Sequence, residues 1–180
     1  MINLYIDAIG IHEMGGYRVL LQFIKKFPSA TFIFDSRLDI TKLPKVKNIQ
    51  LESSNYIYRI IFLHKLKKKL NQNNIVICIS GTPPIINLDC RTFVLFQNLN
   101  LFYNHKNINF FAWILSIDFL RFVNLCFSLN NFETWIVLSD LSKKIIIKKF
   151  GFNKRIIKLW ILNNKFNIKK KYMISFTQQH

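Results

Sequence analysis

Short apolar runs alternate along this chain with longer segments whose apolar residues recur at helical spacing. The apolar runs predict strands over residues 1–10, 31–35, 46–51, 75–80, 92–96, 135–138 and 156–162. The periodic segments predict helices over 17–27, 56–70, 110–129 and 140–150. Strands that alternate with helices are typical of a parallel sheet with helices on both faces. We therefore predict an α/β fold with a Rossmann-like parallel sheet.

The polar residues that follow the predicted strands are candidates for a ligand-binding site. Ligands of parallel α/β sheets bind at the carboxyl ends of the strands, where these residues are expected. In the first connection Gly15 and Gly16 stand directly before a helix, where glycines allow a close approach to a ligand and the helix start favours an anion. The candidate residues are Glu13, Gly15, Gly16, Ser80, Gly81, Thr82, Gln97, Asn98 and Ser139.

Some of these candidates also have explanations that need no ligand. Gly15 and Gly16 match neither the dinucleotide fingerprint nor the Walker pattern, and a tight turn that lets the next helix pack on the sheet would equally require them. Glu13 would equally be a solvated carboxylate in a loop. The histidines and cysteines of the sequence stand in no recognisable catalytic or metal-binding motif, so we predict no metal site.

The charge of the chain is strongly unbalanced, with 26 Lys and Arg against 9 Asp and Glu and a net charge of +17. This predicts an anionic partner: a membrane surface, a phosphorylated substrate or nucleic acid. Candidates for membrane binding gather at the end of the helix predicted over 56–70, namely Lys65, Lys67, Lys68 and Lys69. They would also compensate the helix dipole without any partner. Nucleic acid is the weaker candidate, because most aromatic residues fall on apolar strands or helix faces.

The longest apolar stretch, residues 110–129, contains Asp118, Arg121 and Asn124. Charges in mid-span are costly in a bilayer, so we predict a buried helix with an ion pair between Asp118 and Arg121. Asp7 interrupts the first apolar run and no basic segment precedes it, unlike a secretory signal. Three unevenly spaced cysteines fit a reducing compartment. These features predict a cytoplasmic protein, with peripheral contact to the inner face of the membrane.

A polar and basic segment, residues 163–171, separates the last predicted strand from a new apolar run at 172–176. We expect residues 1–162 to form the Rossmann-like domain and 163–171 to be a linker. Residues 172–180 would then be the first strand of a carboxyl-terminal domain that these 180 residues do not include.

Four segments of the chain resemble the amino-terminal half of nucleotide-sugar glycosyltransferases of the GT-B fold, in the retaining group that builds bacterial polysaccharides. They are the opening strand with Gly15 and Gly16, the SGTPPI stretch at 80–85, the FVLFQN strand at 93–98 and the strand-then-helix segment at 135–152. The ending ISFTQQH resembles the start of that family's second domain.

In that family the amino-terminal domain binds a glycan or lipid-linked acceptor, and the carboxyl-terminal domain binds the nucleotide sugar through paired glutamates. The resemblance implies that this chain is the acceptor side, with the candidate residues lining the acceptor site and no cofactor beyond the donor nucleotide sugar. Gln97 and Asn98 stand where many relatives have a histidine, and neutral amides relay no proton, so no catalytic residue is assigned. The alternative function is a non-catalytic basic α/β module that binds an anionic membrane surface or nucleic acid.

Overall fold

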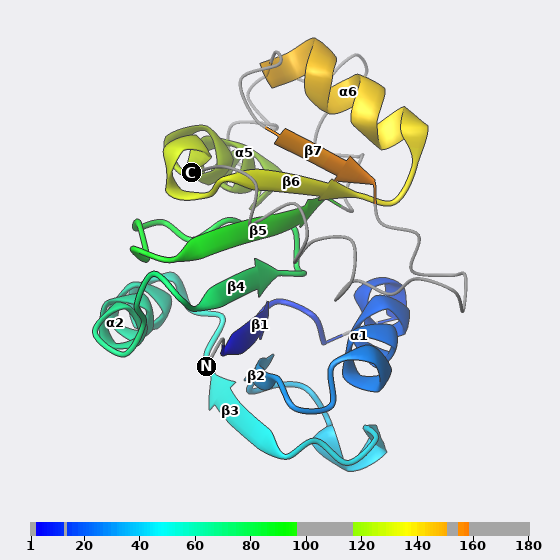
Figure 1. The fold of residues 1–180 in the computed structure, drawn as a ribbon, viewed down its shortest axis with the longest axis vertical. Coiled ribbons are helices and arrows are strands. Elements are labelled where there is room, and N and C mark those ends of the chain that lie inside the picture. The colour runs from blue at the N-terminus through cyan, green and yellow to red at the C-terminus, as the bar shows by residue number, and fades with distance from the viewer. Residues whose placement is uncertain (1–2, 13, 97–116, 151–154, 159–180) are drawn as a thin grey trace.

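A seven-stranded parallel sheet forms the centre of the protein (Figure 1). The computed structural model describes residues 3–12, 14–96, 117–150 and 155–158. The strand order is β3-β2-β1-β4-β5-β6-β7, and each neighbouring pair is parallel. The strands are β1 (Leu4–Ala8), β2 (Thr31–Asp35), β3 (Asn48–Glu52), β4 (Ile75–Cys78), β5 (Arg91–Phe96), β6 (Thr134–Val137) and β7 (Arg155–Lys158).

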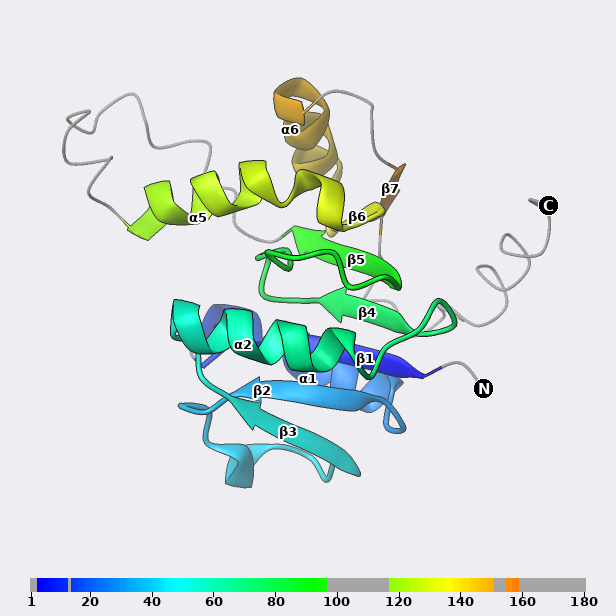
Figure 2. The same ribbon diagram turned by 90° about the vertical axis from the view of Figure 1, so that its left-hand side faces the viewer.

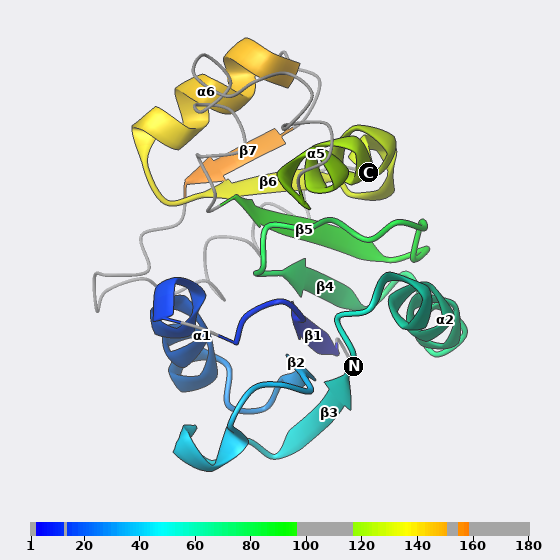
Figure 3. The ribbon, with the colours of Figure 1, turned by 180° about the vertical axis from the view of Figure 1, so that it is seen from behind.

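Helices cover both faces of this sheet, which confirms the predicted Rossmann-like α/β fold. They are α1 (Met14–Lys26), α2 (Tyr56–Lys67), α5 (Ile117–Phe127) and α6 (Asp140–Phe150), with short 3-10 helices η1 (Ile40–Lys42) and η3 (Leu129–Asn131). Helix α1 lies on one face of the sheet, and α2 and α5 lie on the other (Figures 1 and 3). Helix α6 lies beside the edge formed by β6 and β7 (Figure 2).

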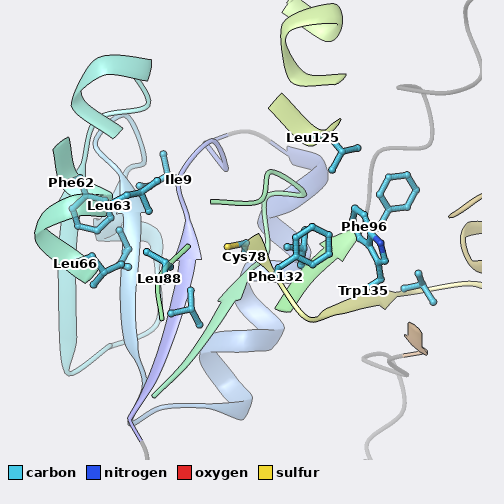
Figure 4. Close-up of a cluster of buried hydrophobic side chains, with 14 of the residues drawn as sticks. Ile9, Phe62, Leu63, Leu66, Cys78, Leu88, Phe96, Leu125, Phe132 and Trp135 are labelled. Carbon is cyan, nitrogen blue, oxygen red and sulfur yellow. The ribbon is translucent and has the colours of Figure 1, made fainter. Parts of the chain in front are cut away.

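Two buried clusters, one on each face, hold these layers together. On the first face, Ile6 and Ala8 of β1 pack against Leu20, Phe23 and Ile24 of α1. The larger cluster on the second face joins α2 and α5 to the sheet through apolar side chains that include Phe62, Leu63, Leu66, Leu125 and Trp135 (Figure 4). Alternate residues of β1, β2, β4, β5 and β6 therefore serve opposite faces, as expected for strands covered on both sides.

The first helix begins earlier than its periodicity predicts. Gly15 and Gly16 lie in the first turn of α1 and not in the loop before it, so the expectation of a glycine loop is wrong. A Cβ added at Gly16 would come within 3.1 Å of both γ carbons of Ile11, which is buried. The missing side chain lets the start of α1 lie close against the residue that leads out of β1.

Helix α2 also differs in detail from its prediction. It ends at Lys67 and not at residue 70, and its N-cap is Asn55, whose side chain accepts a hydrogen bond of 3.0 Å from the N–H of Ile57. Ser53 serves the cap indirectly, since its hydroxyl accepts from the N–H of Asn55 at 3.1 Å. An amide oxygen at the N-cap satisfies one of the free N–H groups of the first turn.

The connection between β4 and β5, residues 79–90, contains no helix. It crosses the sheet as an irregular segment, with Leu88 buried in the second cluster. Asn131 of η3 fastens it by donating to the carbonyls of Pro84 and Ile85 at 3.1 and 2.6 Å. The loop that leaves β4 is thus held in place by side-chain packing and one bridging amide.

Several sequence expectations lie outside the described residues. They concern Glu13, Gln97, Asn98, the linker at 163–171 and the strand at 172–176, together with the side chains of Asp118 and Arg121. In the ranges that the structure does describe, no helix combines the length and the apolar character needed to cross a membrane.

We predict that Gly16→Val lowers the free energy of unfolding by about 2 kcal/mol, because the new side chain overlaps Ile11 in a packed core. Urea unfolding of the single variants and of the pair Gly16→Val/Ile11→Ala measures the coupling. The double variant should lose less stability than the sum of the two single changes, because removing the Ile11 γ and δ carbons makes room for the valine. Additive losses would show that the close approach at Gly16 does not limit packing.

Candidate ligand-binding site at the carboxyl edge

The centre of the sheet contains a reversal in strand order. From β1 the chain proceeds to β2 and β3 on one side, and from β4 it proceeds to β5, β6 and β7 on the other. Strands β1 and β4 are hydrogen-bonded neighbours, and the N–H of Ile79 extends their pairing by donating to the Asp7 carbonyl at 2.8 Å. In open α/β sheets, such a reversal leaves a crevice at the carboxyl edge where ligands bind.

The turn after β1 is built on Gly10. Its φ of +93° is one that a residue with a side chain rarely adopts. The N–H of Ile11 closes the turn by donating to the Ala8 carbonyl at 3.0 Å. A Cβ added at Gly10 would stand 3.8 Å from Cβ of Ser80. The turn after β1 and the turn after β4 therefore lie side by side at the centre of this edge.

Asp35, the last residue of β2, holds this turn from the neighbouring strand. Its carboxylate has no exposed surface and accepts a 2.9 Å hydrogen bond from the N–H of Gly10. Arg37 binds the same carboxylate through Nε at 2.9 Å, Nη2 at 2.8 Å and its backbone N–H at 3.0 Å. Burial by itself would raise the pKa of Asp35, but the hydrogen bonds from Arg37 and Gly10 outweigh it and lower this pKa to about 2.

Asp7 of β1 is a second buried carboxylate, and it binds the backbone where the turn begins. Its Oδ1 accepts from the N–H of Ile9 at 3.0 Å, and its Oδ2 accepts from Nη2 of Arg59 at 2.8 Å. Arg59 comes from the start of α2, and both side chains are more than nine-tenths buried. The ion pair thus fixes α2 against the central strand near the carboxyl edge.

Cys78 ends β4 beside this pair, with its Sγ 3.9 Å from Oδ2 of Asp7. Burial raises the pKa of this thiol well above its usual value, and the nearby Asp7 carboxylate raises it further. A thiol that stays protonated and has no exposed surface is a poor nucleophile. Cys78 therefore serves packing in the second cluster and not chemistry.

The hydroxyl of Ser80 is a further polar group at this edge. Its Oγ is buried and has no hydrogen-bond partner among the described residues. Gly81 follows with a φ of +80°, so the chain turns sharply directly after the serine. Buried hydroxyls are normally paired, and an unpaired one among other polar groups indicates a place for a water molecule or a ligand atom.

The other predicted site residues fall into three groups. Gly15 and Gly16 lie in the first turn of α1, and the half-buried Thr82 lies on the connection that leaves β4. Ser139 follows β6, but its hydroxyl caps α6: it accepts from the N–H of Ser142 at 3.1 Å and lies 2.8 Å from the Ser142 hydroxyl. This local role accounts for Ser139 without a ligand. Glu13, Gln97 and Asn98 lie outside the described residues.

Sequence reasoning missed the residues that shape the turn: Gly10, Asp35 with Arg37, and Asp7 with Arg59. A signal for one pair was present, because Asp7 and Arg59 are single charges of opposite sign inside apolar runs. Such charges are buried only when they are paired. The sequence does not show that these two residues pair with each other, since 52 positions separate them.

Comparisons with known proteins assign this chain to no family. No family model, no curated protein and no solved structure matches the chain. Among the described side chains, no group of three His, Cys, Asp or Glu is placed to hold a metal ion.

We predict that Asp35 makes stability depend on pH in the acid range. Its pKa of about 2 in the folded state lies below the value of about 3.9 expected in the unfolded chain. The carboxylate therefore contributes about 2 kcal/mol above pH 4, and this contribution is lost as the pH falls towards 2. Urea unfolding of the wild type and of Asp35→Asn should differ most at pH 6 and converge near pH 2.

Asp89→Asn is the matched control, since Asp89 is a largely exposed carboxylate paired with Lys67. We expect it to change the free energy of unfolding by less than about 1 kcal/mol at pH 6. A constant difference between the wild type and Asp35→Asn from pH 6 to pH 2 would contradict the assignment of the acid-range effect to this carboxylate.

Proposed function

We propose that this chain is the acceptor-side half of a nucleotide-sugar glycosyltransferase and that the acceptor sugar binds at the carboxyl edge between β1 and β4. The resemblance of four sequence segments to that family supports the reaction class. The strand order supports the position, because it reverses between these two strands. The observation that carries the proposal is the buried, unpaired Ser80 hydroxyl at this edge.

The charges around the turn favour a neutral, hydroxyl-rich ligand. The two buried carboxylates nearest the turn are each paired with an arginine, Asp7 with Arg59 and Asp35 with Arg37. These four side chains therefore present no net charge to a ligand. A sugar hydroxyl can both donate to and accept from the serine hydroxyl, and it needs no countercharge.

The chemical task of such a half is to position the acceptor. Holding two reactants in the reactive geometry supplies a large part of the rate acceleration in group transfer. A turn fixed by two paired carboxylates is suited to this, because its backbone does not need to reorganise when the ligand binds. The donor nucleotide sugar and the groups that stabilise its leaving phosphate would belong to a second domain.

A non-catalytic basic module at a membrane surface is the second candidate function. The exposed apolar and basic residues of α2 favour it. This second function gives no role to the unpaired Ser80 hydroxyl at the carboxyl edge, and for that reason we prefer the first.

We predict that Ser80→Ala separates binding from stability. Removing an unpaired buried hydroxyl should leave the free energy of unfolding unchanged or raise it by up to about 1 kcal/mol. The same change should weaken saccharide binding, measured by saturation-transfer NMR with a panel of mono- and disaccharides. Ser139→Ala is the matched control: it should lower stability by about 1 kcal/mol through loss of the α6 cap and leave saccharide binding unaltered.

Two results would contradict this assignment. If Ser80→Ala lowers stability as much as Ser139→Ala does, the hydroxyl has a partner within the protein and is not reserved for a ligand. If saccharides bind equally well to the wild type and to Ser80→Ala, the acceptor does not contact this edge.

We also predict that these 180 residues transfer no sugar and bind no nucleotide sugar. One well-placed donor group alone is worth about 10²–10³ in rate at a site of developing charge, and we assign those groups to the other half of the enzyme. Isothermal titration with uridine and guanosine diphosphate sugars should give no heat of binding, and a radiolabelled-sugar assay should give no product. Turnover by the isolated chain would place the donor site within residues 1–180.

A further inference from the structure

One surface of the protein exposes more apolar side chains than its fold requires. It combines the edge strand β3 with the outer side of α2, and we call it the α2–β3 face. Its large exposed apolar residues are Tyr56, Ile57, Tyr58 and Ile61 of α2, whereas the exposed Ile49 and Leu51 of β3 are paired with Phe32 and Phe34 and belong to the opposite face of the sheet. Ile57 is 67% exposed and Tyr58 is 62% exposed. A contiguous set of this kind usually marks an interaction site.

The first two turns of α2 are apolar on both sides. Phe62, Leu63 and Leu66 point into the second core cluster, whereas Ile57 and Ile61 point away from it. A surface helix normally carries polar residues on the side that faces water. The apolar outer side of α2 is therefore not explained by packing against the other residues that the structure describes.

Lysines continue the same exposed side towards the end of α2. Lys65, Lys68 and Lys69 are exposed. A groove of about 160 Å³ between β3 and α2 brings Lys65 and Lys69 together with Tyr58 and Ile61 in its lining. Lys67 differs from the other three, because its Nζ lies 2.9 Å from a carboxylate oxygen of Asp89.

We propose that the α2–β3 face docks the protein peripherally on an anionic phospholipid bilayer. The isoleucines and tyrosines insert among the headgroups, and Lys65, Lys68 and Lys69 contact lipid phosphates. Apolar residues beside lysines on one helix are the combination that binds such an interface. The net charge of +17 adds long-range attraction to an anionic leaflet.

Nucleic acid fits this face less well than a bilayer does. Binders of single strands stack bases on aromatic rings and arginines, but the arginine of α2, Arg59, is buried in its pair with Asp7. Ile57 and Ile61 offer no stacking surface. Aliphatic side chains gain free energy from a hydrocarbon environment and gain little from a phosphate backbone.

The apolar contribution can be tested with Ile57→Ser/Ile61→Ser in co-sedimentation with vesicles of phosphatidylglycerol and phosphatidylcholine. We expect the wild type to bind these vesicles and not pure phosphatidylcholine, and the variant to bind about tenfold more weakly. Leu141→Ser is the control: this leucine is 51% exposed and belongs to α6, which lies at the far edge of the sheet from β3, and its loss should leave binding unchanged (Figure 1). Because all three side chains are exposed, circular dichroism should show an unaltered fold.

The electrostatic contribution can be tested with two double variants that remove the same charge from different places. Lys65→Ser/Lys68→Ser removes two charges from the α2–β3 face and should weaken binding and reduce its dependence on salt. Lys143→Ser/Lys144→Ser removes the same charge from exposed positions of α6, near the opposite edge of the sheet, and should have a much smaller effect (Figure 1).

Three results would overturn the proposal. One is equal vesicle binding by the wild type and Ile57→Ser/Ile61→Ser. Another is a wild-type dimer that becomes a monomer in that variant while vesicle binding is unaffected, which would make the face a contact between two copies. The third is binding to an oligonucleotide but not to vesicles, lost with the two lysines. None of these measurements uses a saccharide, so they are independent of the proposed acceptor site.

Discussion

The buried ion pair between Asp7 and Arg59 connects the two surfaces to which we assign functions. On one side, Asp7 accepts from the N–H of Ile9 and so begins the turn that brings Gly10 against Ser80. On the other side, Arg59 fixes the start of α2, whose outer side carries Ile57 and Ile61. Removing one partner of such a pair typically costs 3–5 kcal/mol, because the other charge is left buried alone. The pair therefore contributes to the shape of both surfaces.

A second carboxylate completes the carboxyl edge in a different way. Asp35 binds a backbone N–H and an arginine two positions along the chain, so its contacts fix the path of the loops after β1 and β2. In other sheets of this order an acidic residue near this position is available to a ligand. Here Arg37 and Gly10 occupy it, and Ser80 is the group to which we assign the contact with a ligand. Loop construction and ligand recognition are thus divided between different residues at the same edge.

The two surfaces also differ in what they need from the fold. The proposed acceptor edge would need precise placement of a few backbone groups, which the central strands and the paired carboxylates provide. The α2–β3 face would need only exposed apolar area beside lysines, which the outer side of α2 provides. Their connection through α2 means that a membrane-bound protein would hold its acceptor edge at a fixed orientation to the bilayer, a useful property if the acceptor is lipid-linked.

The sequence by itself determined the fold class and nearly every strand, because alternation of apolar runs with helical periodicity is a local property that a covered parallel sheet imposes on each segment. It also identified Ser80 as a site candidate, since polar residues after buried strands meet at one edge. Only the tertiary structure decided that Gly16 packs on Ile11, that Ser139 is a helix cap and that Asp7 meets Arg59. These depend on which segments become neighbours. The sequence could not identify the exposed apolar residues of α2 for the same reason. Periodicity shows that a helix is apolar, but the neighbouring elements decide which of its apolar residues are buried.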